Sequence, residues 1–389
     1  MSANNRPLLL DVSRLIWRRW AGLLPTGIDR VCLSYLARYR AEAQAVVHGR
    51  GVRRILDESA SDRLFDALAD SGPGVRKNLI SLLPRLLLPS PTSRAGRKRL
   101  YLNVGHTGLQ EQSLIEWTRS ADVRPIYLIH DLIPITHPEY CRPGEAVRHA
   151  GRIRNVLSSA TGIIANSRAT LESLAEFAAR ERLPMPRAVV ALLGAELGRG
   201  SPRAAEVQPE RPTFVMLGTI EARKNHLLLL QIWSRLARSL GSRTPRLLII
   251  GQRGWECEQV VDLLDRCQPI QDHVREVGRC SDSELEYHLR TARALLFPSL
   301  VEGFGLPLIE ALGLGTPVIA SDLPVFREIS PGVPTYIDPL DGPKWEQAVL
   351  AYSEEGSVVR NEQLIRLADH RQLSWDDHFA TINDWLLET

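Results

Sequence analysis

The amino-acid sequence predicts two α/β domains, each with a doubly wound parallel β-sheet that helices cover on both faces. Short apolar runs of strand length alternate with helical patterns along most of the 389 residues, as is typical of parallel sheets. The alternation stops once, at 195–212, where Gly, Pro, Arg and Glu are frequent and no periodicity is present. That composition is typical of a linker. At about 150 residues per domain, the length fits two or three domains.

The composition excludes several classes of protein. Hydrophobic residues make up 44% and charged residues 24% of the chain, as in ordinary globular proteins, so the chain is neither disordered nor collagen-like. The formal net charge is only +3, and we therefore expect no nucleic-acid partner. The five cysteines form no Cys-x-x-Cys pair, which argues against a zinc cluster or a disulfide framework and favours a reducing compartment.

The sequence also indicates a location. The longest apolar run, 79–88, is interrupted by Pro84 and Arg85 and is shorter than the roughly 20 residues of a membrane-spanning helix. The first residues lack the basic region, the apolar stretch and the cleavage site of a signal peptide. We therefore expect a cytoplasmic protein, either free or at the inner face of the plasma membrane.

In the first half of the chain, six apolar runs bounded by Gly, Pro, Asp or Asn predict buried strands. They lie at 7–12, 45–48, 99–104, 125–130, 162–166 and 188–193. Helical patterns separate several of these runs, and they lie at 26–40, 108–119, 144–160 and 167–182. The pattern therefore predicts repeated strand–helix units in this half.

After the linker the alternation resumes, with strands predicted at 213–217, 246–250, 274–277, 294–298 and 317–320. Helices are predicted at 225–240, 256–266, 281–291 and 306–312. Ser281 and Glu284 have the spacing of a capping box at the start of the third helix. The two blocks predict two Rossmann-like domains, 1–197 and 213–370. We expect the ligand at the carboxyl ends of the strands, between the domains.

The segment 299–317 contains the first candidate site. It follows a predicted strand, leads into a predicted helix and contains Glu302, Gly303, Gly305 and Glu310. The glycines allow backbone N–H groups to approach a ligand closely, and a helix N-terminus favours a phosphate. Each glutamate could accept hydrogen bonds from a pair of sugar or ribose hydroxyls. The simpler interpretation is a glycine turn with two solvated glutamates, and the two flanking carboxylates make it less favoured.

A second candidate site lies at 217–226, again between a strand and a helix. Gly218 follows the strand, and Arg223 and Lys224 stand at the predicted start of the helix. Cations at a helix N-terminus oppose the helix dipole, so the pair is poorly placed unless an anion such as a diphosphate lies in front of it. A solvated surface pair is the alternative.

Together these segments resemble the family-4 retaining glycosyltransferases of the GT-B fold. The resemblance is carried by the Glu-x7-Glu element from Glu302 to Glu310, and by Gly-Thr-Ile-Glu-x-Arg-Lys-Asn at 218–225. The sequence of the second motif is most similar to the corresponding sequence in bacterial mannosyl- and rhamnosyltransferases of surface polysaccharide assembly. Further matches lie at 129–134, 164–167, 277–285, 296–299 and 316–321, whereas 49–98 matches nothing in the family.

The resemblance implies a role for each matched residue. Arg223 and Lys224 would neutralise the diphosphate leaving group of a sugar nucleotide. Glu310 would bind its ribose, Glu302 would lie near the transferred sugar, and His130 would contact that sugar from the first domain. The helix at 371–389 would cross back to the first domain. The other donor-binding positions would be Gly218, Gly278, Arg279, Cys280, Gly303, Phe304, Gly305 and Leu306.

The candidates for the acceptor side of the site are Gly27, His106, Asn166 and Ser167. The glycine-rich loop that often follows the first strand in the family is absent, and only Gly27 is left for a close approach. His106 ends a predicted strand, where facing the cleft and a structural capping role are equally supported. Some relatives place an arginine where Thr219 stands, so the phosphate charge rests more heavily on Arg223 and Lys224.

The resemblance implies no metal and no cofactor. Cations and helix N–H groups can stabilise the departing diphosphate, and no Asp-x-Asp metal motif accompanies the site. Retention can proceed by front-face attack, in which the leaving phosphate accepts the proton of the acceptor; His130 as a general base is a less favoured alternative. The expected substrates are a sugar nucleotide, with GDP-mannose first, and a glycan or lipid-linked saccharide acceptor.

Two other functions fit the same pattern. A sugar-nucleotide epimerase shares the two-domain architecture, although the Arg-Lys pair together with the Glu-x7-Glu element disfavours it. A binding protein without catalytic activity could also keep the fold. Conversion of the donor without an acceptor would identify the epimerase, and donor binding without turnover would identify the binding protein.

A basic stretch raises a further question. Seven Lys and Arg residues gather at 76–99, and no acidic residue lies between Asp70 and Glu111. Leu82 and Leu86 fall on one helical face with other leucines, so docking on an anionic membrane surface and packing onto the core are equally favoured. The cluster Trp17-Arg18-Arg19-Trp20 could belong to the same face or bind the acceptor.

Overall fold

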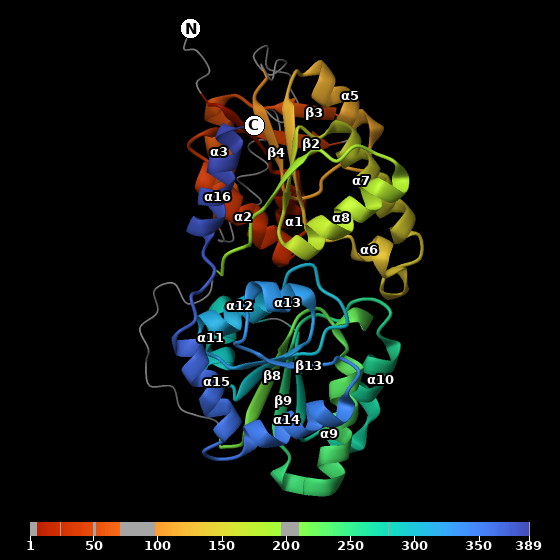
Figure 1. Ribbon diagram of the computed structural model, residues 1–389, viewed down its shortest axis with the longest axis vertical. Coiled ribbons are helices and arrows are strands. Elements are labelled where there is room, and N and C mark those ends of the chain that lie inside the picture. The colour runs from red at the N-terminus through yellow and green to blue at the C-terminus, as the bar shows by residue number, and fades with distance from the viewer. Residues whose placement is uncertain are drawn as a thin grey trace. The chain divides into compact units, whose positions relative to one another are not determined.

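Two β-sheets organise the chain (Figure 1). The computed structural model describes residues 6–23, 25–49, 52–70, 98–195, 210–278 and 280–388. The chain divides into two units. Unit 1 contains Met1–Leu132, Ala146–Ala191 and Phe379–Thr389, and unit 2 contains Ile133–Glu145 and Leu192–His378.

The sheet of unit 1 has seven strands in the order β3-β2-β1-β4-β5-β6-β7. Apolar side chains fill β1 and the centres of β4 to β6, and they are almost fully buried, as strands covered on both faces require. The strands are β1 (Leu8–Asp11), β2 (Ala43–Gly49), β3 (Val52–Ile55), β4 (Leu100–Asn103), β5 (Arg124–Ile129), β6 (Gly162–Ala165) and β7 (Arg187–Val190).

Strand β3 corrects the prediction of a purely parallel sheet. It pairs antiparallel with β2, with Arg53 opposite His48, whereas the other pairs of this sheet are parallel. No strand was expected at 52–55, because the sequence Val-Arg-Arg-Ile contains no apolar run. The Arg53 side chain is nevertheless buried, because its Nη2 lies 3.1 Å from a carboxylate oxygen of Glu111. The burial of Arg53 in this strand therefore depends on Glu111, a residue that is distant in the sequence.

Helices cover both faces of this sheet (Figure 1). The predicted helices at 26–40, 144–160 and 167–182 are confirmed to within one residue at each end, and the one predicted at 108–119 begins four residues later. The first helix after β1 and the helix after β3 were not expected, because one is short and the other lies in the unmatched region. One face carries α1 (Ser13–Trp20), α2 (Gly27–Tyr39) and α3 (Glu58–Ala69), and the other carries α5 (Gln112–Ser120), α7 (Glu145–Ser159) and α8 (Arg168–Glu181).

The sheet of unit 2 has six strands in the order β10-β9-β8-β11-β12-β13, and its neighbours pair in parallel. The bounds predicted for β8, β9 and β10 agree with the structure at both ends. The strands are β8 (Thr213–Leu217), β9 (Arg246–Ile250), β10 (Val274–Val277), β11 (Ala294–Phe297), β12 (Val318–Ser321) and β13 (Thr335–Ile337).

Helices also cover both faces of this second sheet (Figure 1). One face carries α9 (His226–Leu240), α10 (Glu258–Arg266) and α14 (Gly342–Ser353), and the other carries α11 (Asp282–Thr291), α12 (Leu306–Gly313) and α13 (Pro324–Ile329). The predicted capping box of α11 is confirmed, because Ser281 N–H donates to Glu284 at 2.8 Å and Glu284 N–H donates to Ser281 Oγ at 3.2 Å. The remaining elements of unit 2 are α6 (Ile133–Thr136), η2 (Pro138–Tyr140), η3 (Ala222–Lys224), η4 (Gly241–Arg243), η5 (Gln268–Ile270) and α15 (Val358–Ala368).

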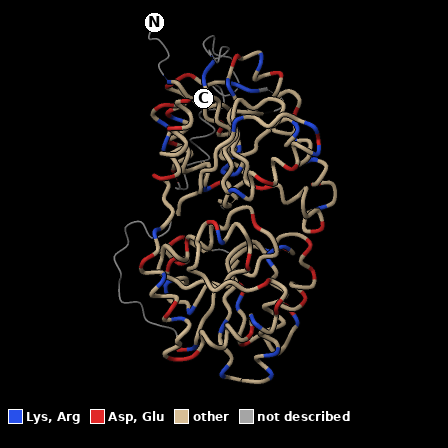
Figure 2. The backbone as a smooth tube through the Cα atoms, in the orientation of Figure 1, with Lys and Arg blue, Asp and Glu red and all other residues tan. Residues whose placement is uncertain are grey.

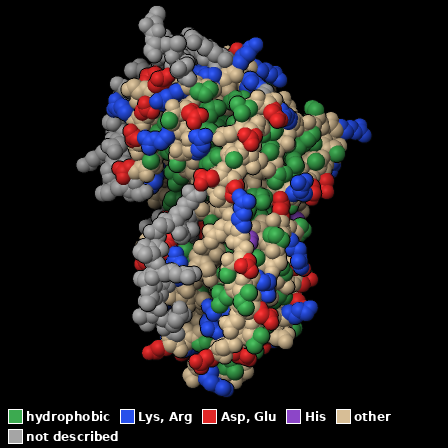
Figure 3. Space-filling view, turned by 60° about the vertical axis from the view of Figure 1, so that its left-hand side comes forward, with side chains coloured by type: hydrophobic (Ala, Val, Ile, Leu, Met, Phe, Trp, Pro, Cys, Tyr) green, Lys and Arg blue, Asp and Glu red, His purple; other side chains and the backbone are tan. Residues whose placement is uncertain are grey.

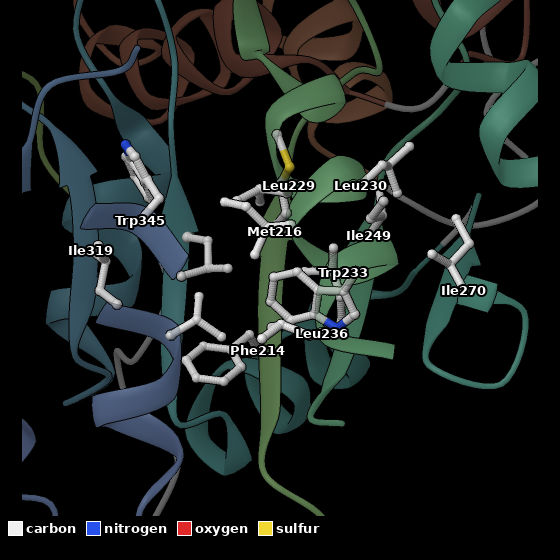
Figure 4. Close-up of a cluster of buried hydrophobic side chains, with 14 of the residues drawn as sticks. Phe214, Met216, Leu229, Leu230, Trp233, Leu236, Ile249, Ile270, Ile319 and Trp345 are labelled. Atoms are coloured by element: carbon white, nitrogen blue, oxygen red, sulfur yellow. The ribbon is translucent and has the colours of Figure 1, made fainter. Parts of the chain in front are cut away.

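A hydrophobic core lies between β8 and α9 (Figure 4). Phe214 and Met216 of β8 pack with Leu229 and Trp233 of α9, and the Phe214 and Trp233 rings meet edge-on with centroids 6.0 Å apart. The buried indole N–H of Trp233 donates to the carbonyl of Pro245 at 2.8 Å, so its polar group is satisfied. This packing holds β8 in place and thereby positions the residues that follow it.

Helix α16 (Trp375–Leu387) lies within 371–389, where the sequence analysis expected a helix. Its residues from Phe379 onwards belong to unit 1. There the Phe379 ring lies 5.1 Å from the ring of Tyr35 and 5.5 Å from that of Tyr39, both in α2. Gly162 of β6 leaves room for Trp385, because a Cβ at this position would overlap the indole ring. The domain boundaries predicted at 1–197, 213–370 and 371–389 stay predictions.

Each sheet has one switch point, where adjacent strands lead into connections that run in opposite directions. It lies between β1 and β4 in unit 1 and between β8 and β11 in unit 2. Open α/β sheets bind ligands outside the carboxyl ends of the strands at such a point. The segments after β8 and β11 are 217–226 and 299–317, so the fold brings together the two motifs that the sequence singled out.

Positions of acidic and basic residues are interspersed along the backbone of both units (Figure 2). The face shown in Figure 3 has the same mixture, with hydrophobic side chains between the charges. The distribution agrees with the small net charge of +3. Within the described ranges, no helix combines the length and the apolar character needed to span a bilayer.

Candidate functional site

The residues that follow β8 form the first half of the candidate site. Gly218 has a φ of 135°, which side chains disfavour, and its N–H donates to the carbonyl of Ile250 at 3.0 Å. Gly251 follows β9, and a Cβ there would overlap the carbonyl oxygen of Gly218. The close contact between these two loops therefore requires glycine at 251. Further along, Leu300 N–H donates to the carbonyl of Arg223 at 2.8 Å, which joins η3 to the segment after β11.

Four charged side chains meet between the segments after β8 and β11. Nη1 of Arg223 donates to Oε2 of Glu302 at 2.8 Å, and Nη2 of Arg223 lies 2.6 Å from Oε1 of Glu221. Nζ of Lys224 forms an ion pair with Oε1 of Glu302, and this oxygen also accepts a hydrogen bond from Ser299 at 2.8 Å. Two cations and two carboxylates therefore form one network, in which the formal charges sum to zero.

This network is largely buried. Glu302 and Lys224 each expose 8% of their side chains, and Arg223 exposes 22%. Burial raises the pKa of Glu302, but the positive charges of Arg223 and Lys224 lower it by more, so that the pKa is about 2. Burial also lowers the pKa of Lys224, and the carboxylate of Glu302 opposes that shift. Glu302 is therefore ionised at neutral pH, beside two preorganised cations.

The positions of Arg223 and Lys224 differ from the prediction. Both lie in the turn η3, and Asn225, with a φ of 60°, separates them from the first residue of α9. Their charges have carboxylate partners in Glu221 and Glu302, so their position does not by itself require an anionic ligand. An ammonium group has three N–H donors, however, so Lys224 can bind a phosphate oxygen and keep Glu302 as its partner.

Helix α12 begins beyond the same network. Gly305 precedes it with a φ of 120°, and a Cβ there would come within 2.8 Å of the Phe326 ring. Pro307 is the second residue of the helix, where its missing N–H costs no helical hydrogen bond. Glu310 is only 4% exposed. The remaining predicted donor-binding residues of this segment are Gly303, Phe304 and Leu306, and Phe304 is buried.

The loop that contains the predicted donor-binding residues Gly278, Arg279 and Cys280 follows β10, which β9 separates from β8. Gly251 N–H donates to the carbonyl of Val277 at 3.0 Å, so this loop lies beside the one after β9. A Cβ on Gly278 would meet nothing within 4 Å, and no steric contact requires glycine there. Burial raises the pKa of the Cys280 thiol. Arg279 lies outside the described residues.

In unit 1, His130 follows β5 directly and is 6% exposed. Its Nε2 lies 2.8 Å from the carbonyl oxygen of Val104. A carbonyl oxygen only accepts hydrogen bonds, so Nε2 carries the proton and Nδ1 carries the lone pair. Burial lowers the pKa of His130 to about 4. At neutral pH the ring is uncharged, accepts a hydrogen bond at Nδ1 and is a weak base.

Two other predicted residues of unit 1 lie against His130. Nδ2 of Asn166 donates to the main-chain carbonyl of His130 at 2.8 Å. The His106 ring has its centroid 4.8 Å from that of His130. Ser167 instead caps α8, because its Oγ accepts the N–H of Thr170 at 3.1 Å. The structure therefore separates a supporting role for Asn166 from a capping role for its neighbour.

Gly27 is the first residue of α2, where Thr26 and Asp29 form a capping box. Helix α1 exposes 59% of Trp17 and 47% of Trp20, whereas the other six tryptophans are buried or half-buried. Most of the basic stretch, including Leu82 and Leu86, lies outside the described residues. Among the residues that are described, no group of three or more His, Cys, Asp or Glu side chains could hold a metal ion.

The sequence analysis missed three residues of the site, namely Glu221, Gly251 and Ser299. A signal for the glycine was present, because β8, β9 and β10 are each followed directly by a glycine. Glu221 stands inside the quoted motif, two residues before Arg223, and Ser299 stands three residues before Glu302. Nothing in the local sequence shows that both belong to one network, because the contacts of Arg223 and Lys224 with Glu302 join segments 79 and 78 residues apart.

Comparison with known proteins bears on this site. Residues 201–330, which contain both motifs, match the family described as "Glycosyl transferases group 1". The chain is 30% identical over 267 residues to the "Serotype-specific mannosyltransferase WbdA" of Escherichia coli, a match that covers 64% of this chain and 32% of the relative. It is 29% identical to the "O-antigen chain mannosyltransferase B" of Escherichia coli, covering 68% of this chain and 70% of that one. The chain therefore spans about a third of the length of the WbdA relative.

Comparison with solved structures concerns the fold. The crystal structure of Anabaena Alr3699/HepE in complex with UDP and glucose is similar, with a TM-score of 0.67 and 14% sequence identity. The match covers 98% of this chain and 99% of HepE. With so little sequence identity, the similarity identifies the fold of this chain as GT-B, as the sequence analysis predicted.

Proposed function

We propose that the chain transfers a hexosyl unit from a sugar nucleotide to an acceptor hydroxyl with retention of configuration, and the match of residues 201–330 to the group 1 glycosyl transferases supports this proposal. The observation that carries the proposal is the network of Arg223, Lys224 and Glu302 at the switch point of unit 2. The buried Lys224 and the half-buried Arg223 both bind Glu302, which stands four residues before the first residue of α12. Two cations and a helix N-terminus both favour a diphosphate.

In the proposed reaction, the bond between the anomeric carbon and the diphosphate oxygen breaks. The acceptor oxygen forms the new bond on the same face of the sugar, and its proton passes to the departing phosphate oxygen. Positive charge develops on the sugar and negative charge on the diphosphate. Arg223 and Lys224 stabilise the negative charge, because their carboxylate partners already hold them in position before the reaction.

Glu302 is assigned a positioning role in this scheme. One of its oxygens binds Lys224 and Ser299, and the other binds Arg223. Loss of its charge would leave two buried cations with a single carboxylate, Glu221, and would weaken their alignment. The direct contact of Glu302 with the transferred sugar, which the resemblance implied, stays a prediction.

His130 is assigned a hydrogen-bonding role rather than that of a general base. The Nε2–H of His130 donates a hydrogen bond to the Val104 carbonyl. The low pKa of the His130 ring makes it a poor proton acceptor at neutral pH. The lone pair on Nδ1 suits a hydroxyl of the transferred sugar. Front-face attack needs no separate base, because the leaving phosphate takes the proton.

The proposed donor is GDP-mannose, and the proposed acceptor is a glycan or a lipid-linked saccharide. The names of the two Escherichia coli relatives support mannose and a surface polysaccharide. The solved HepE complex contains UDP and glucose, which makes UDP-glucose the competing donor to test. A thermal-shift screen of GDP-, UDP-, ADP- and CMP-sugars decides the donor, since a ligand that binds the native state raises the melting temperature. The largest shift is expected with GDP-mannose.

Transfer itself is tested with radiolabelled GDP-mannose and a mannose-terminated acceptor. Lys224→Ala and Glu302→Gln are expected to lower kcat by 100-fold or more, because each disturbs the charge balance that stabilises the leaving diphosphate. Lys344→Ala is the matched control, since Lys344 of α14 is 69% exposed and forms its ion pair with Asp341, the residue before that helix. Retention is read from the anomeric configuration of the product by NMR.

The same assay separates the competing functions. An epimerase would convert the donor without an acceptor, and its product sugar would differ in configuration. A binding protein would show a thermal shift with the donor but no turnover. If Lys224→Ala and Glu302→Gln both retain full transfer, the site assigned here is wrong.

The proposed reaction requires no metal ion, because Arg223 and Lys224 supply the positive charge that a divalent cation supplies in other transferases. Activity is therefore expected to remain within twofold after dialysis against EDTA. Loss of activity that Mg²⁺ or Mn²⁺ restores would overturn this part of the proposal.

The proposed location is the cytoplasmic face of an anionic membrane, close to a lipid-linked acceptor. The basic, leucine-containing sequence at 76–99 supports it. In liposome flotation, the variant with Leu82 and Leu86 changed to Glu and Arg76, Lys77 and Arg85 changed to Ser is expected to lose binding. A variant with the exposed Arg327 and Lys344 changed to Ser is the control. Unchanged flotation of the first variant would reject the membrane proposal.

A further inference from the structure

Two histidines form a reciprocal pair at the carboxyl ends of β4 and β5. These strands pair in parallel, with Asn103 opposite Tyr127. Three residues beyond each of them stand His106 and His130, so the two histidines occupy equivalent places beyond the strand ends. Each ring reaches back to the other strand's segment. Nε2 of His106 lies 2.9 Å from the carbonyl oxygen of Leu128, and Nε2 of His130 lies 2.8 Å from that of Val104.

The two contacts determine the tautomer of both rings. The partner of each Nε2 is a carbonyl oxygen, which can only accept, so both Nε2 atoms carry hydrogen. Both Nδ1 atoms therefore carry lone pairs. The ring centroids are 4.8 Å apart, at an angle of 58°. Two hydrogen bonds thus join the two segments: the His106 side chain donates to the β5 side, and the His130 side chain donates to the β4 side.

The backbone of His106 is strained, which is unusual for such a residue. Its φ is 58°, in the left-handed region that residues other than glycine rarely occupy. Such a conformation persists where the surroundings demand it. Here the conformation accompanies the bond from the His106 ring to Leu128.

The main chain around His130 is held from the opposite side as well. The carbonyl of His130 accepts hydrogen bonds from Nδ2 of Asn166 at 2.8 Å and from Oγ1 of Thr170 at 3.4 Å. The carbonyl of Asp131 accepts from Nε2 of His149 at 3.1 Å. His130 therefore has a fixed backbone and a fixed Nε2, and no described residue hydrogen-bonds to its Nδ1.

We propose that His106 is a positioning residue for His130: by binding the Leu128 carbonyl it keeps the segment after β4 against β5, so that the Val104 carbonyl holds His130 with Nδ1 presented as a hydrogen-bond acceptor to the sugar of the donor. The inference rests on the proposed function, because it assumes that His130 contacts the donor sugar. The inference assigns a role to His106, for which the sequence analysis left a capping role and a cleft-facing role as alternatives.

The charged and titratable groups near the pair favour an uncharged state. Beside His106 are His130, His149 and Arg152, and each of them disfavours a positive charge on His106. Near His130, Arg14 disfavours the charged ring, and Asp131 and Asp29 favour it. Burial opposes charge on both rings and is the largest effect. The pair is therefore neutral at the pH of the assay.

Three substitutions at position 106 separate the positioning role from a purely structural one. His106→Gln keeps a nitrogen donor at nearly the same distance from the backbone as Nε2. Asparagine in His106→Asn tolerates the left-handed backbone, but its shorter side chain does not extend its amide nitrogen as far as the position of Nε2. His106→Leu removes the donor altogether. His370→Leu, in a histidine beyond α15 and distant in the sequence from the pair, is the control.

The first readout is the tautomer of His130, measured by two-bond ¹H–¹⁵N NMR in the full chain. The wild type and His106→Gln are expected to show a single Nε2–H tautomer. His106→Asn and His106→Leu are expected to show a mixture of tautomers, because the Val104 carbonyl is no longer held against the ring. This measurement needs no substrate, so it tests the pair even if the proposed function fails.

The second readout is kinetic, with GDP-mannose as the probe and at a temperature well below the melting point of every variant. His106→Leu is expected to lower kcat/KM for the donor by 10- to 100-fold, because misplacement by about 1 Å can cost that much. The KM for the acceptor should change less than twofold, and His106→Gln should stay within about threefold of the wild type. A merely structural role would lower the melting temperature without this pattern.

The outcomes decide the proposal. A single Nε2–H tautomer and wild-type kcat/KM in His106→Leu would overturn it. If that variant does not fold, His106→Asn takes its place with the same expectations. If the wild type turns over no sugar nucleotide but His106→Leu still loses the single tautomer, the proposed function fails, and the role of His106 in holding His130 stands.

Discussion

At the scale of single residues, burial and ion pairing decide the charges of buried side chains in both units. Burial lowers the pKa of His130 to about 4 and that of His226, the first residue of α9, to about 3. For Glu302 the neighbouring cations outweigh burial and lower the pKa to about 2. The protein therefore carries neutral histidines and an ionised, buried carboxylate at neutral pH, and each group gives a separate dependence of stability on pH.

The pKa of Glu302 predicts acid sensitivity below pH 4.5. The unfolded chain binds this proton with a pKa near 4.5 and the folded chain only near 2, so the unfolded state gains protons first as the pH falls. The ion pair therefore contributes stability above pH 4.5 that is lost between 4.5 and 2. The loss is on the order of 3 kcal/mol. Urea unfolding of Glu302→Gln between pH 5 and pH 3 is expected to show a smaller decline than the wild type.

A matched control for this experiment is Glu362→Gln on the exposed side of α15. It should decline with pH as steeply as the wild type. Equal slopes for Glu302→Gln and the wild type would show that Glu302 titrates like an exposed carboxylate, and the ion pair with Lys224 and Arg223 would then contribute no acid-dependent stability.

His226 predicts a second window at higher pH. Its ring is 1% exposed, no described residue hydrogen-bonds to either nitrogen, and its folded pKa of about 3 lies below the ordinary 6.5. Stability is therefore lost as the pH falls below 6.5, where the unfolded state takes up the proton first. His226→Leu is expected to raise the free energy of unfolding by about 1 kcal/mol at pH 8. At pH 5 the gain should be about 2 kcal/mol larger.

The control for this prediction is His370→Leu, whose histidine is half-exposed beyond α15. Its effect should differ between pH 8 and pH 5 by less than that of His226→Leu. If His226→Leu destabilises the protein at both pH values, the imidazole makes a favourable contact that the free energy of burial does not include.

At the scale of elements, glycines decide how closely the loops at the switch point of unit 2 approach. A Cβ on Gly251 would overlap the carbonyl oxygen of Gly218, so Gly251→Ala is expected to push the loops after β8 and β9 apart. The expected cost is about 1–3 kcal/mol of unfolding free energy. The thermal shift with GDP should fall as well, because Gly218 leads directly into the turn that carries Arg223.

Gly151→Ala is the control for this change. Gly151 lies inside α7, and a Cβ there would meet nothing within 4 Å. Alanine favours a helix interior over glycine by about 1 kcal/mol, so this variant should be as stable as the wild type or more stable. Wild-type stability of Gly251→Ala would show that the two loops move apart at no cost.

At the scale of the whole molecule, the two units carry different groups of candidate residues. The cation network lies in unit 2, and the pair of His106 and His130 lies in unit 1. Binding of the nucleotide alone is therefore expected to act on unit 2. In hydrogen exchange, saturating GDP should slow the amides at 218–224 and 302–308, whereas those of β6 and β7 should keep their rates.

Lys224→Ala is the variant that tests the origin of this protection. It removes one of the two cations, so GDP at the same concentration should protect the amides of unit 2 much less. Equal protection in the variant and the wild type would place the nucleotide elsewhere. Protection confined to unit 1 would contradict the assignment of the donor site to the switch point between β8 and β11.

Much of the fold could be predicted from the sequence because the relevant forces act locally. Apolar runs identified β8 and β9 with their bounds, and the spacing of Ser281 and Glu284 identified the start of α11. The strand β3 could not be predicted, because Arg53 is polar and becomes buried only through Glu111. Of the site, Arg223, Lys224 and Glu302 were predicted as candidates, whereas their mutual neutralisation and the part of Glu221 were not.

The sequence alone determined the alternation of strands and helices and the two motifs that follow β8 and β11. These features depend on hydrophobic periodicity and on residues a few positions apart, so they can be read without coordinates. The tertiary structure decided which charges neutralise one another and which nitrogen of His130 carries the proton. Those properties depend on contacts between residues that are 79 positions apart in one case and 26 in the other, and only the packing of the sheets brings them together.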